Sequence, residues 1–331
     1  MSITEQPHSS FRILNTEPGH LSSDARRTLR KLALVDEVEA DRQYLLGHIE
    51  NYDGLFVCLR NVLDKEILQR ATRLKCIVTP TTGLDHIDVT YAQKLDVEII
   101  SLRGETQFLE TVTATAELAW GMLLALVRKI PMAHQNVMAG KWQRDNFYGK
   151  ELREMTLGII GYGRLGRILG KYGGAFGMHV LAHDINPLLT SGVEFVGLVE
   201  LFGRSDIISV HLDLNDSTRG LLNRNLFSQV KRGAIFINTA RGEIVDEVAL
   251  LDALRNGTLS GAGLDVLTDE NTNHPNWLKN TALYAYAQEH DNLLITPHIG
   301  GVTFQSVNNT NQYIINKLAN YLRGAFGTCE Q

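Results

Sequence analysis

Three short segments in the second half of the chain place charged side chains directly after apolar runs that are typical of β-strands. Arg241 follows the first run, and His298 follows the third. Asp265 ends the second run, and two more acids, Asp269 and Glu270, come soon after it. Because ligands bind beyond the carboxyl ends of the strands in open parallel sheets, we expect these side chains to share one site.

An arginine, an acid and a histidine together suit the reduction of a 2-keto acid. The guanidinium binds a carboxylate through two parallel hydrogen bonds and polarises the adjacent carbonyl. A protonated imidazole gives its proton to the carbonyl oxygen, and a neighbouring carboxylate stabilises the imidazolium and orients its tautomer. Each residue alone also has a structural interpretation: His298 as a hydrogen-bonded histidine, and Arg241 as a surface partner of Asp246. The prediction therefore depends on their occurring together with a hydride carrier.

The sequence Gly161-Tyr-Gly163-Arg-Leu-Gly166 predicts the binding site for that carrier. It follows the apolar run Thr156–Ile160 and opens a helical stretch, Arg164–Phe176. Gly161 allows the tight turn, Gly163 lets the backbone approach a diphosphate, and Gly166 lets helix and strand pack closely. The diphosphate is expected on the free amide groups at the start of the helix.

Asp184 indicates which dinucleotide binds. It ends a second apolar run, 23 residues after Gly161, where a carboxylate meets the adenosine ribose in such folds. The carboxylate accepts hydrogen bonds from a free diol and repels a 2′-phosphate, and Ile185, Asn186 and Pro187 provide no cation. The sequence predicts NAD rather than NADP. The alternative is that Asp184 caps the next helix.

Short apolar runs alternate with helical patterns throughout, which predicts an α/β fold with parallel sheets. Two sets of runs indicate two doubly wound domains. We expect a Rossmann NAD-binding domain, residues 105–300, inserted into a discontinuous flavodoxin-like substrate domain, residues 1–104 and 301–331, with a hinged cleft between them. The expected strands are Phe11–Leu14, Ala33–Val38, Gly54–Leu59, Cys76–Val78, Val97–Leu102, and then Thr156–Ile160, His179–Ala182, Ile207–His211, Ala234–Asn238, Gly263–Val266 and Leu293–Thr296.

Two helices stand out in the pattern. One is expected over Thr115–Ile130, capped by Thr113 or Thr115 and stopped by Pro131. Its central run is apolar on every side, more than one core face can bury, which predicts a homodimer. A final amphipathic helix is expected over Gln305–Leu322.

The length, charge and cysteine content of the chain argue against several other classes of protein. The chain has 331 residues and a net charge of −5, which gives no electrostatic footprint for nucleic acid or an anionic membrane. Its N-terminus has no secretory pattern, and its longest apolar run is too short to span a bilayer. Cys58, Cys76 and Cys329 are few and far apart, and the sequence predicts no metal site. A reduced, cytoplasmic enzyme is expected.

The chain resembles the D-isomer-specific 2-hydroxyacid dehydrogenases, in the branch that contains D-3-phosphoglycerate dehydrogenase. The resemblance runs from about Phe11 to Leu322 and is most specific at Gly158–Gly166, Asn238–Glu247, Gly261–Asp265 and Thr296–Gly301. It implies that Arg241 binds substrate, His298 is the acid/base and Glu270 is its acid partner. Glu270 has the family's five-residue offset from Asp265, and Asp269 does not.

The resemblance also implies binding roles for other positions. The loop from His211 to Gly220 is similar to the family's loop over the adenosine half, although Asp213 stands where a proline is usual. The loop from Thr81 to Asp88 is similar to the one whose backbone holds the substrate carboxylate. The implied cofactor contacts are Gly161, Gly163, Arg164, Leu165, Gly166, Asp184, His211, Thr218, Thr239, Ala240 and Asp265, and the implied substrate contacts are Arg60, Thr82, Gly83 and Arg241.

The departures from the family concern the substrate. Phosphoglycerate members often carry an Arg-Ser pair after the third strand, whereas here Arg60 is shifted within Val57–Asn61. The segment Asn271–Asn280 is longer than usual, and we expect its Trp277 to be a hydrophobic plug rather than a lid. The chain ends soon after the last helix, so the family's serine-sensing regulatory domain is not expected.

Two functional hypotheses follow. The first is an NAD-dependent oxidoreductase acting between a D-2-hydroxy acid and its 2-keto acid, including 3-phosphoglycerate-like substrates. The second is an NAD(H)-sensing interaction protein, because corepressors use the same fold and keep the triad. The absence of a basic patch and of long polar tails favours the enzyme.

Overall fold

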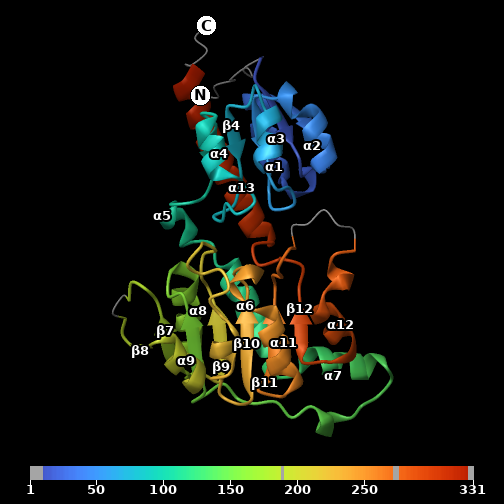
Figure 1. The fold of residues 1–331 in the computed structure, drawn as a ribbon, viewed down its shortest axis with the longest axis vertical. Helices are drawn as coiled ribbons and strands as arrows, with labels where there is room; N and C mark the ends of the chain where they lie inside the picture. The colour runs from blue at the N-terminus through green and yellow to red at the C-terminus, as the bar shows by residue number, and fades with distance from the viewer. Residues whose placement is uncertain (1–9, 188–189, 271–275, 327–331) are drawn as a thin grey trace. The chain divides into compact units, whose positions relative to one another are not determined.

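The computed structural model describes residues 10–187, 190–270 and 276–326. The chain divides into two compact units (Figure 1). One unit is discontinuous and comprises Met1–Val112 and Val302–Gln331, and the other comprises Thr113–Gly301. Residues 105–112, expected in the NAD-binding domain, thus group with the discontinuous unit.

The discontinuous unit is built on a five-stranded parallel sheet in the order β2-β1-β3-β4-β5, which is the flavodoxin-like order. Its strands are β1 Arg12–Asn15, β2 Leu34–Glu37, β3 Gly54–Phe56, β4 Cys76–Val78 and β5 Glu98–Ile100. Its α-helices are α1 Ser23–Leu32, α2 Arg42–His48, α3 Lys65–Arg70, α4 Val89–Lys94, α5 Thr106–Leu109 and α13 Phe304–Phe326, with short 3-10 turns at Pro18–His20 and Ile49–Asn51.

Successive residues of β1 supply the cores on the two faces of this sheet, because side chains alternate along a strand. Ile13 packs with α1 and with Ile314 and Leu318 of α13. Leu14 packs on the other face with α2, α3 and α4. The returning helix α13 therefore completes the core of the unit that begins the chain.

The second unit is built on a seven-stranded parallel sheet in the order β12-β11-β10-β9-β6-β7-β8, the order of a Rossmann sheet with one added strand. Its strands are β6 Thr156–Ile160, β7 His179–His183, β8 Val193–Phe195, β9 Ile207–Val210, β10 Ala234–Asn238, β11 Leu259–Leu264 and β12 Leu293–Ile295. Its α-helices are α6 Ala114–Val127, α7 Ile130–Met138, α8 Arg164–Ala175, α9 Leu198–Arg204, α10 Arg224–Phe227, α11 Glu247–Arg255 and α12 Ala282–Glu289, with 3-10 turns at Arg144–Asn146, Gly242–Ile244 and Leu278–Asn280.

Helices cover both faces of the seven-stranded sheet. Residues of α6 and α8 pack with Ile159 and Ile237 on one face. Residues of α9, α11 and α12 pack with Ile160 and Phe236 on the other. The predicted fold class, a Rossmann domain inserted into a flavodoxin-like domain, is confirmed.

The structure corrects the predicted helix over Thr115–Ile130. Helix α6 ends at Val127, and Pro131 lies in the first turn of α7 instead of stopping α6. Proline is tolerated there because the first amide groups of a helix have no partner within it. Thr113 is the N-cap residue, but its hydroxyl donates to Glu117 at 2.5 Å rather than capping the backbone.

One stretch, Thr106–Val127, is long and apolar enough by composition to cross a membrane. In the structure it is divided between α5 and α6, and α6 alone has 14 residues, fewer than a bilayer requires. Ala119, Met122 and Leu123 of α6 are buried in the Rossmann unit. The stretch therefore supplies a core helix.

Candidate active site

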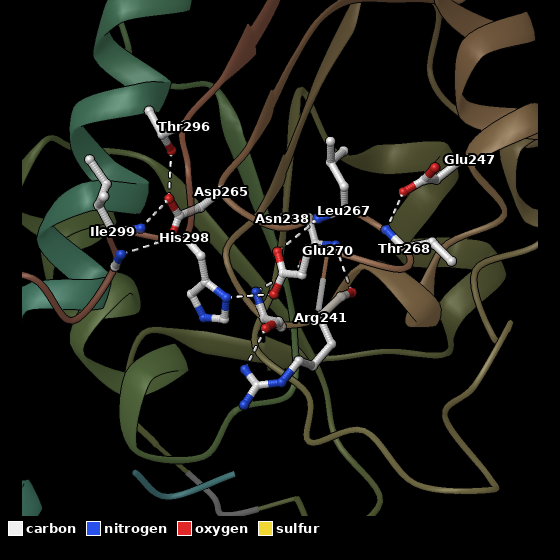
Figure 2. A network of polar contacts seen from close by, with 12 residues as sticks. Asn238, Arg241, Glu247, Asp265, Leu267, Thr268, Glu270, Thr296, His298 and Ile299 are labelled. Atoms are coloured by element: carbon white, nitrogen blue, oxygen red, sulfur yellow. Dashed lines mark hydrogen bonds and ion pairs between the residues drawn. The ribbon is translucent and has the colours of Figure 1, made fainter. Parts of the chain in front are cut away.

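The side chains of His298 and Glu270 meet beyond the carboxyl ends of β12 and β11 (Figure 2). His298 Nδ1 lies 2.5 Å from Glu270 Oε1, and the two side chains are 24% and 15% exposed. Asp269, the alternative acid, is adjacent and has a left-handed backbone with φ 61°. Of the two neighbouring acids, Glu270 therefore contacts the imidazole.

A buried carboxylate fixes the loop that carries His298. Asp265, only 1% exposed, accepts hydrogen bonds from Thr296 Oγ1 at 2.6 Å, Ile299 N at 2.8 Å and Gly300 N at 2.7 Å. The backbone of His298 has φ 51°, and its N–H donates to the Asp265 carbonyl at 2.8 Å. Burial raises the pKa of the Asp265 carboxyl, and its hydrogen-bond donors act in the opposite direction. Asp265 thus holds a backbone conformation that histidine rarely adopts.

The strand end that carries Arg241 is held by Asn238. The side chain of Asn238 donates to the Arg241 carbonyl at 2.9 Å and accepts from Ala240 N at 3.0 Å. Arg241 Nη1 donates to the Ala240 carbonyl at 2.8 Å. A Cβ atom on Gly242 would lie 2.1 Å from the carbonyl carbon of Leu267, so only glycine fits there. This close approach brings the strand end against the turn that leads to Glu270.

The glycine turn after β6 has the shape that a diphosphate requires. Gly161 has φ 89°, and a Cβ on it would lie 2.5 Å from the His211 carbonyl oxygen. A Cβ on Gly166 would lie 2.2 Å from the Gly161 carbonyl oxygen. Gly163 is exposed with open space beside it, and no side chain caps the start of α8 within the described ranges. The first amides of this 12-residue helix, including those of Arg164 and Leu165, suit an anion.

A buried hydroxyl lies at the end of β10. Thr239 is 6% exposed, and its Oγ1 has no hydrogen-bond partner in the part of the chain that the structure describes. An unpaired buried hydroxyl is costly, so a polar partner is expected at this point. Together with the glycine turn, Thr239 and the adjacent Ala240 fit a dinucleotide at the carboxyl edge of the sheet.

Asp184 joins two strand ends. Its Oδ2 accepts from Tyr162 N at 2.8 Å and its Oδ1 accepts from Asn186 N at 2.8 Å. The carboxylate thus ties the end of β7 to the turn after β6 instead of capping a helix. Asp246, the surface partner considered for Arg241, accepts from Ala249 N at 3.0 Å as the N-cap of α11.

The loop after β9 contains two further predicted cofactor residues. His211 Nε2 is 2.9 Å from Ser209 Oγ, and burial lowers the pKa of His211 to about 4, so its imidazole is neutral near pH 7. The hydroxyl of Thr218 donates to the Asp213 carbonyl at 2.7 Å and accepts from Asn215 N at 2.9 Å. Thr218 therefore shapes the loop through its own side chain.

The remaining predicted substrate residues lie in the discontinuous unit. Arg60 is exposed and forms an ion pair with Glu39. Thr82 is exposed, and the carbonyl of Gly83 accepts from Thr81 Oγ1 at 2.8 Å. These residues follow β3 and β4, so they lie towards the carboxyl edge of the five-stranded sheet.

Sequence reasoning assigned no role to three residues that shape the site. Asn238, Thr296 and Glu247 each bond to the backbone or side chain of a site segment, Glu247 through its Oε1 and Thr268 N at 2.7 Å. An asparagine at a strand end was a usable signal, because its side chain often bonds to the next backbone groups. Glu247 resembled any acid in the first turn of a helix.

The long segment before α12 is described in part. Trp277 is partly buried and packs against the core beneath α11 and α12. Residues 271–275 and Cys329 lie outside the described residues. Cys58 and Cys76 are free thiols, and burial raises the pKa of both to about 12, which leaves them protonated and unreactive near pH 7.

Residues 120–300 match the family model described as the D-isomer specific 2-hydroxyacid dehydrogenase, NAD binding domain. A D-3-phosphoglycerate dehydrogenase of Archaeoglobus fulgidus is 34% identical over 322 residues, covering 95% of this chain and 58% of the relative. The Homo sapiens D-3-phosphoglycerate dehydrogenase is 33% identical over 297 residues, covering 88% of this chain and 53% of the relative. The chain thus spans little more than half the length of these curated relatives.

Solved structures match over nearly the whole chain. The TT0316 protein from Thermus thermophilus has a TM-score of 0.82 at 33% identity, covering 95% of this chain and 97% of that one. A D-lactate dehydrogenase from Aquifex aeolicus, complexed with NAD and lactic acid, has a TM-score of 0.83 at 28% identity, covering 96% and 97%.

Proposed function

Because the chain belongs to the D-isomer specific 2-hydroxyacid dehydrogenase family, we propose that it is an NAD-dependent oxidoreductase that interconverts a D-2-hydroxy acid and its 2-keto acid. The contact between His298 Nδ1 and Glu270 Oε1 carries this proposal. It pairs an acid with a base on the sheet edge where the glycine turn and Thr239 fit a dinucleotide.

The cofactor and three side chains have separate roles in the proposed reaction. Bound NADH supplies the hydride, and NAD accepts it in the reverse direction. Arg241 binds the substrate carboxylate and polarises the neighbouring carbonyl. Glu270 engages Nδ1 of His298, so Nε2 is the atom that exchanges a proton with the substrate oxygen. In reduction the imidazolium donates that proton, and in oxidation the neutral imidazole accepts it.

The cofactor is held by the glycine turn, Asp184 and the end of β10. Asp184 is aligned by Tyr162 and Asn186, and its remaining lone pairs suit the hydroxyls of an adenosine ribose. A 2′-phosphate would meet the same negative charge, which favours NAD over NADP. The other proposed cofactor contacts are Gly161, Gly163, Arg164, Leu165, Gly166, His211, Thr218, Thr239, Ala240 and Asp265.

The substrate class is a small 2-hydroxy or 2-keto acid. We propose that the loop with Thr82 and Gly83 binds the substrate carboxylate through its backbone. Arg60 is the candidate for a second anionic group, such as the phosphate of a 3-phosphoglycerate-like substrate. Its ion pair with Glu39 must open before Arg60 can bind such a group.

We also propose a cytoplasmic homodimer that uses neither nucleic acid nor membrane as a partner. The predicted dimer helix, Thr115–Ile130, is largely α6, half of whose residues are buried within its own unit. Support for the dimer comes instead from exposed apolar side chains along and after α7, namely Ile130, Val137, Met138, Trp142 and Tyr148. Light scattering at micromolar concentration should give twice the chain's mass, and a monomeric mass would contradict the proposal.

Turnover tests the function directly. The purified protein is offered a panel of 2-keto acids with NADH or NADPH while absorbance of the reduced cofactor is followed. We expect turnover of at least one keto acid, with NADH preferred. Tight NADH binding without turnover across the panel would instead favour an NAD(H)-sensing interaction protein.

A further inference from the structure

The turn from Leu267 to Glu270 determines where the acid of the proposed pair points. Glu270 Oε1 contacts His298, and its Oε2 accepts from Leu267 N at 3.3 Å (Figure 2). Asp269, immediately before the acid, has a left-handed backbone. Such a backbone is uncommon for a residue with a side chain, although aspartate tolerates it better than most, so contacts from outside the turn can help to hold it.

Within the described residues, two contacts from outside the turn hold it. Gly242 packs its backbone against Leu267 and Thr268, as its lack of space for a Cβ requires. Glu247, the first residue of α11, accepts a hydrogen bond from Thr268 N at 2.7 Å. Glu247 is therefore the side chain that anchors the turn two residues before Glu270.

The position of Glu247 is otherwise unfavourable for a carboxylate. Burial raises the pKa of Glu247, the Thr268 donor opposes that change, and the carboxylates of Asp269 and Glu243 act with the burial. Glu247 also borders a mostly apolar pocket of about 450 Å³, lined among others by Trp277. The hydrogen bond from Thr268 and the position of Glu247 in the first turn of α11 both favour a carboxylate in these surroundings.

We propose that Glu247 is a positioning residue: by anchoring Thr268, it keeps Glu270 in contact with His298. This inference rests on the proposed function, because it assigns Glu247 an effect on proton transfer through Glu270. Among the described residues, Glu270 contacts the His298 imidazole, the carboxylate of Asp265 interacts electrostatically with His298, and Arg241 lies in the same network of polar contacts (Figure 2). A merely structural Glu247 would alter stability and leave the pH dependence of turnover unchanged.

Two conservative variants of Glu247 distinguish the effect of its side-chain length from the effect of its charge. Glu247→Gln keeps an oxygen at the same distance from Thr268 N, whereas Glu247→Asp keeps the charge and is one methylene too short. The measurement is kcat for keto-acid reduction by NADH across pH. In the Gln variant, we expect kcat to fall at the same pH as in the wild type. In the Asp variant, we expect this fall to occur roughly 0.5–1 pH unit lower, because a less firmly held Glu270 stabilises the imidazolium less.

The control is Asp252→Asn on the same helix, whose carboxylate pairs with Arg224 at 2.8 Å. Its pH profile should match the wild type. NADH binding, followed by protein fluorescence, should be unchanged in all these variants. A shift in the Gln variant as large as in the Asp variant would overturn the role of the hydrogen bond.

A double-mutant cycle distinguishes this inference from the proposed function. Glu270→Gln alone should lower the pH at which reduction falls, and adding Glu247→Asp should shift it no further. An equal further shift in the double variant would show that Glu247 acts without Glu270, which overturns the inference alone. A Glu270→Gln profile identical to the wild type would overturn both the acid–base assignment and the inference.

Discussion

The candidate charged side chains at the carboxyl edges of the two parallel sheets differ in exposure: His298 and Glu270 are 24% and 15% exposed, and Arg60 is 54% exposed. In the seven-stranded sheet, buried polar side chains fix the loops that carry charge: Asp265 holds the loop of His298, and Asn238 holds the backbone of Arg241. In the five-stranded sheet, buried polar side chains also fix the loops, as where Glu17 accepts a hydrogen bond from Cys58 N at 3.0 Å. The predicted anion-binding side chain, Arg60, is nevertheless exposed and pairs with Glu39 at the surface.

This difference matches the different requirements of groups that take part in the reaction and groups that recognise the substrate. Proton transfer and charge stabilisation need groups held in place before the reaction, because reorganising them would add to the barrier. Recognition of a variable substrate tolerates an exposed side chain that can change partners. We therefore expect substitutions on the edge of the seven-stranded sheet to affect turnover far more than substitutions on the edge of the five-stranded sheet.

The largest effect is expected for His298→Gln. Glutamine keeps a similar size and polarity but cannot serve as the proton donor, so kcat for keto-acid reduction should fall by about 10²–10⁴-fold. NADH binding should be retained. His179→Gln is the matched control, because His179 is an exposed histidine at the amino end of β7 in the same unit. Near-normal turnover in His298→Gln would remove it from the proposed mechanism.

Arg241→Ala should have the second-largest effect on turnover. Losing charge-assisted hydrogen bonds to the substrate carboxylate should lower kcat/KM by roughly 10²–10³-fold, with kcat and KM both affected. Arg241→Lys should recover only part of the loss, because an ammonium cannot make the bidentate contact. Arg255→Ala, on the exposed end of α11, should behave like the wild type. An Arg241→Lys variant with full activity would argue against a bidentate role.

Asp184→Ala should produce a smaller, cofactor-specific change. Removing the carboxylate should raise the KM for NADH about tenfold and improve the use of NADPH. The preference for NADH over NADPH should therefore become smaller. The ratio of kcat/KM values for the two cofactors is the measurement. Equal use of NADH and NADPH by the wild-type protein would contradict the role given to Asp184.

The smallest effect is expected for Arg60→Ala. An exposed ion pair contributes little, so stability should change by less than about 1 kcal/mol and kcat/KM for simple keto acids by less than about threefold. The same variant tested with 3-phosphohydroxypyruvate sharpens the comparison. A decrease in kcat/KM for the phosphorylated substrate alone would indicate that Arg60 binds the phosphate. A large decrease in kcat/KM for every substrate would contradict the contrast between the two sheet edges.

The fold was predictable because the sequence repeats strong local signals. Strands such as Ala234–Asn238 are continuous apolar runs bounded by glycine or polar residues, as buried parallel strands require. Strand β8, Val193–Phe195, was missed because three residues with a central acid carry no recognisable period. The break between α6 and α7 was misplaced because a proline in the first turn of a new helix looks the same as one that ends the previous helix.

The candidate residues Arg241, Glu270 and His298 were predicted from strand ends and from the family offset. The structure brings two of them, Glu270 and His298, into contact, as predicted. The left-handed backbones of His298 and Asp269 were not predicted, because few residues other than glycine adopt that conformation and the hydrogen bond from His298 N to the Asp265 carbonyl joins residues far apart in the chain. Likewise, the bond between Glu247 and Thr268 joins residues 21 positions apart, which only the folded structure reveals.

The most direct test of the central claim, that one imidazole moves the proton in both directions, is the pH dependence of the forward and reverse reactions of the wild-type protein. Reduction requires the His298 imidazolium, so its kcat/KM should fall as pH rises. Oxidation of the D-2-hydroxy acid requires the neutral imidazole, so its kcat/KM should rise over the same pH range. Opposed profiles with a shared midpoint are the predicted result. Two profiles that move in the same direction would contradict the account.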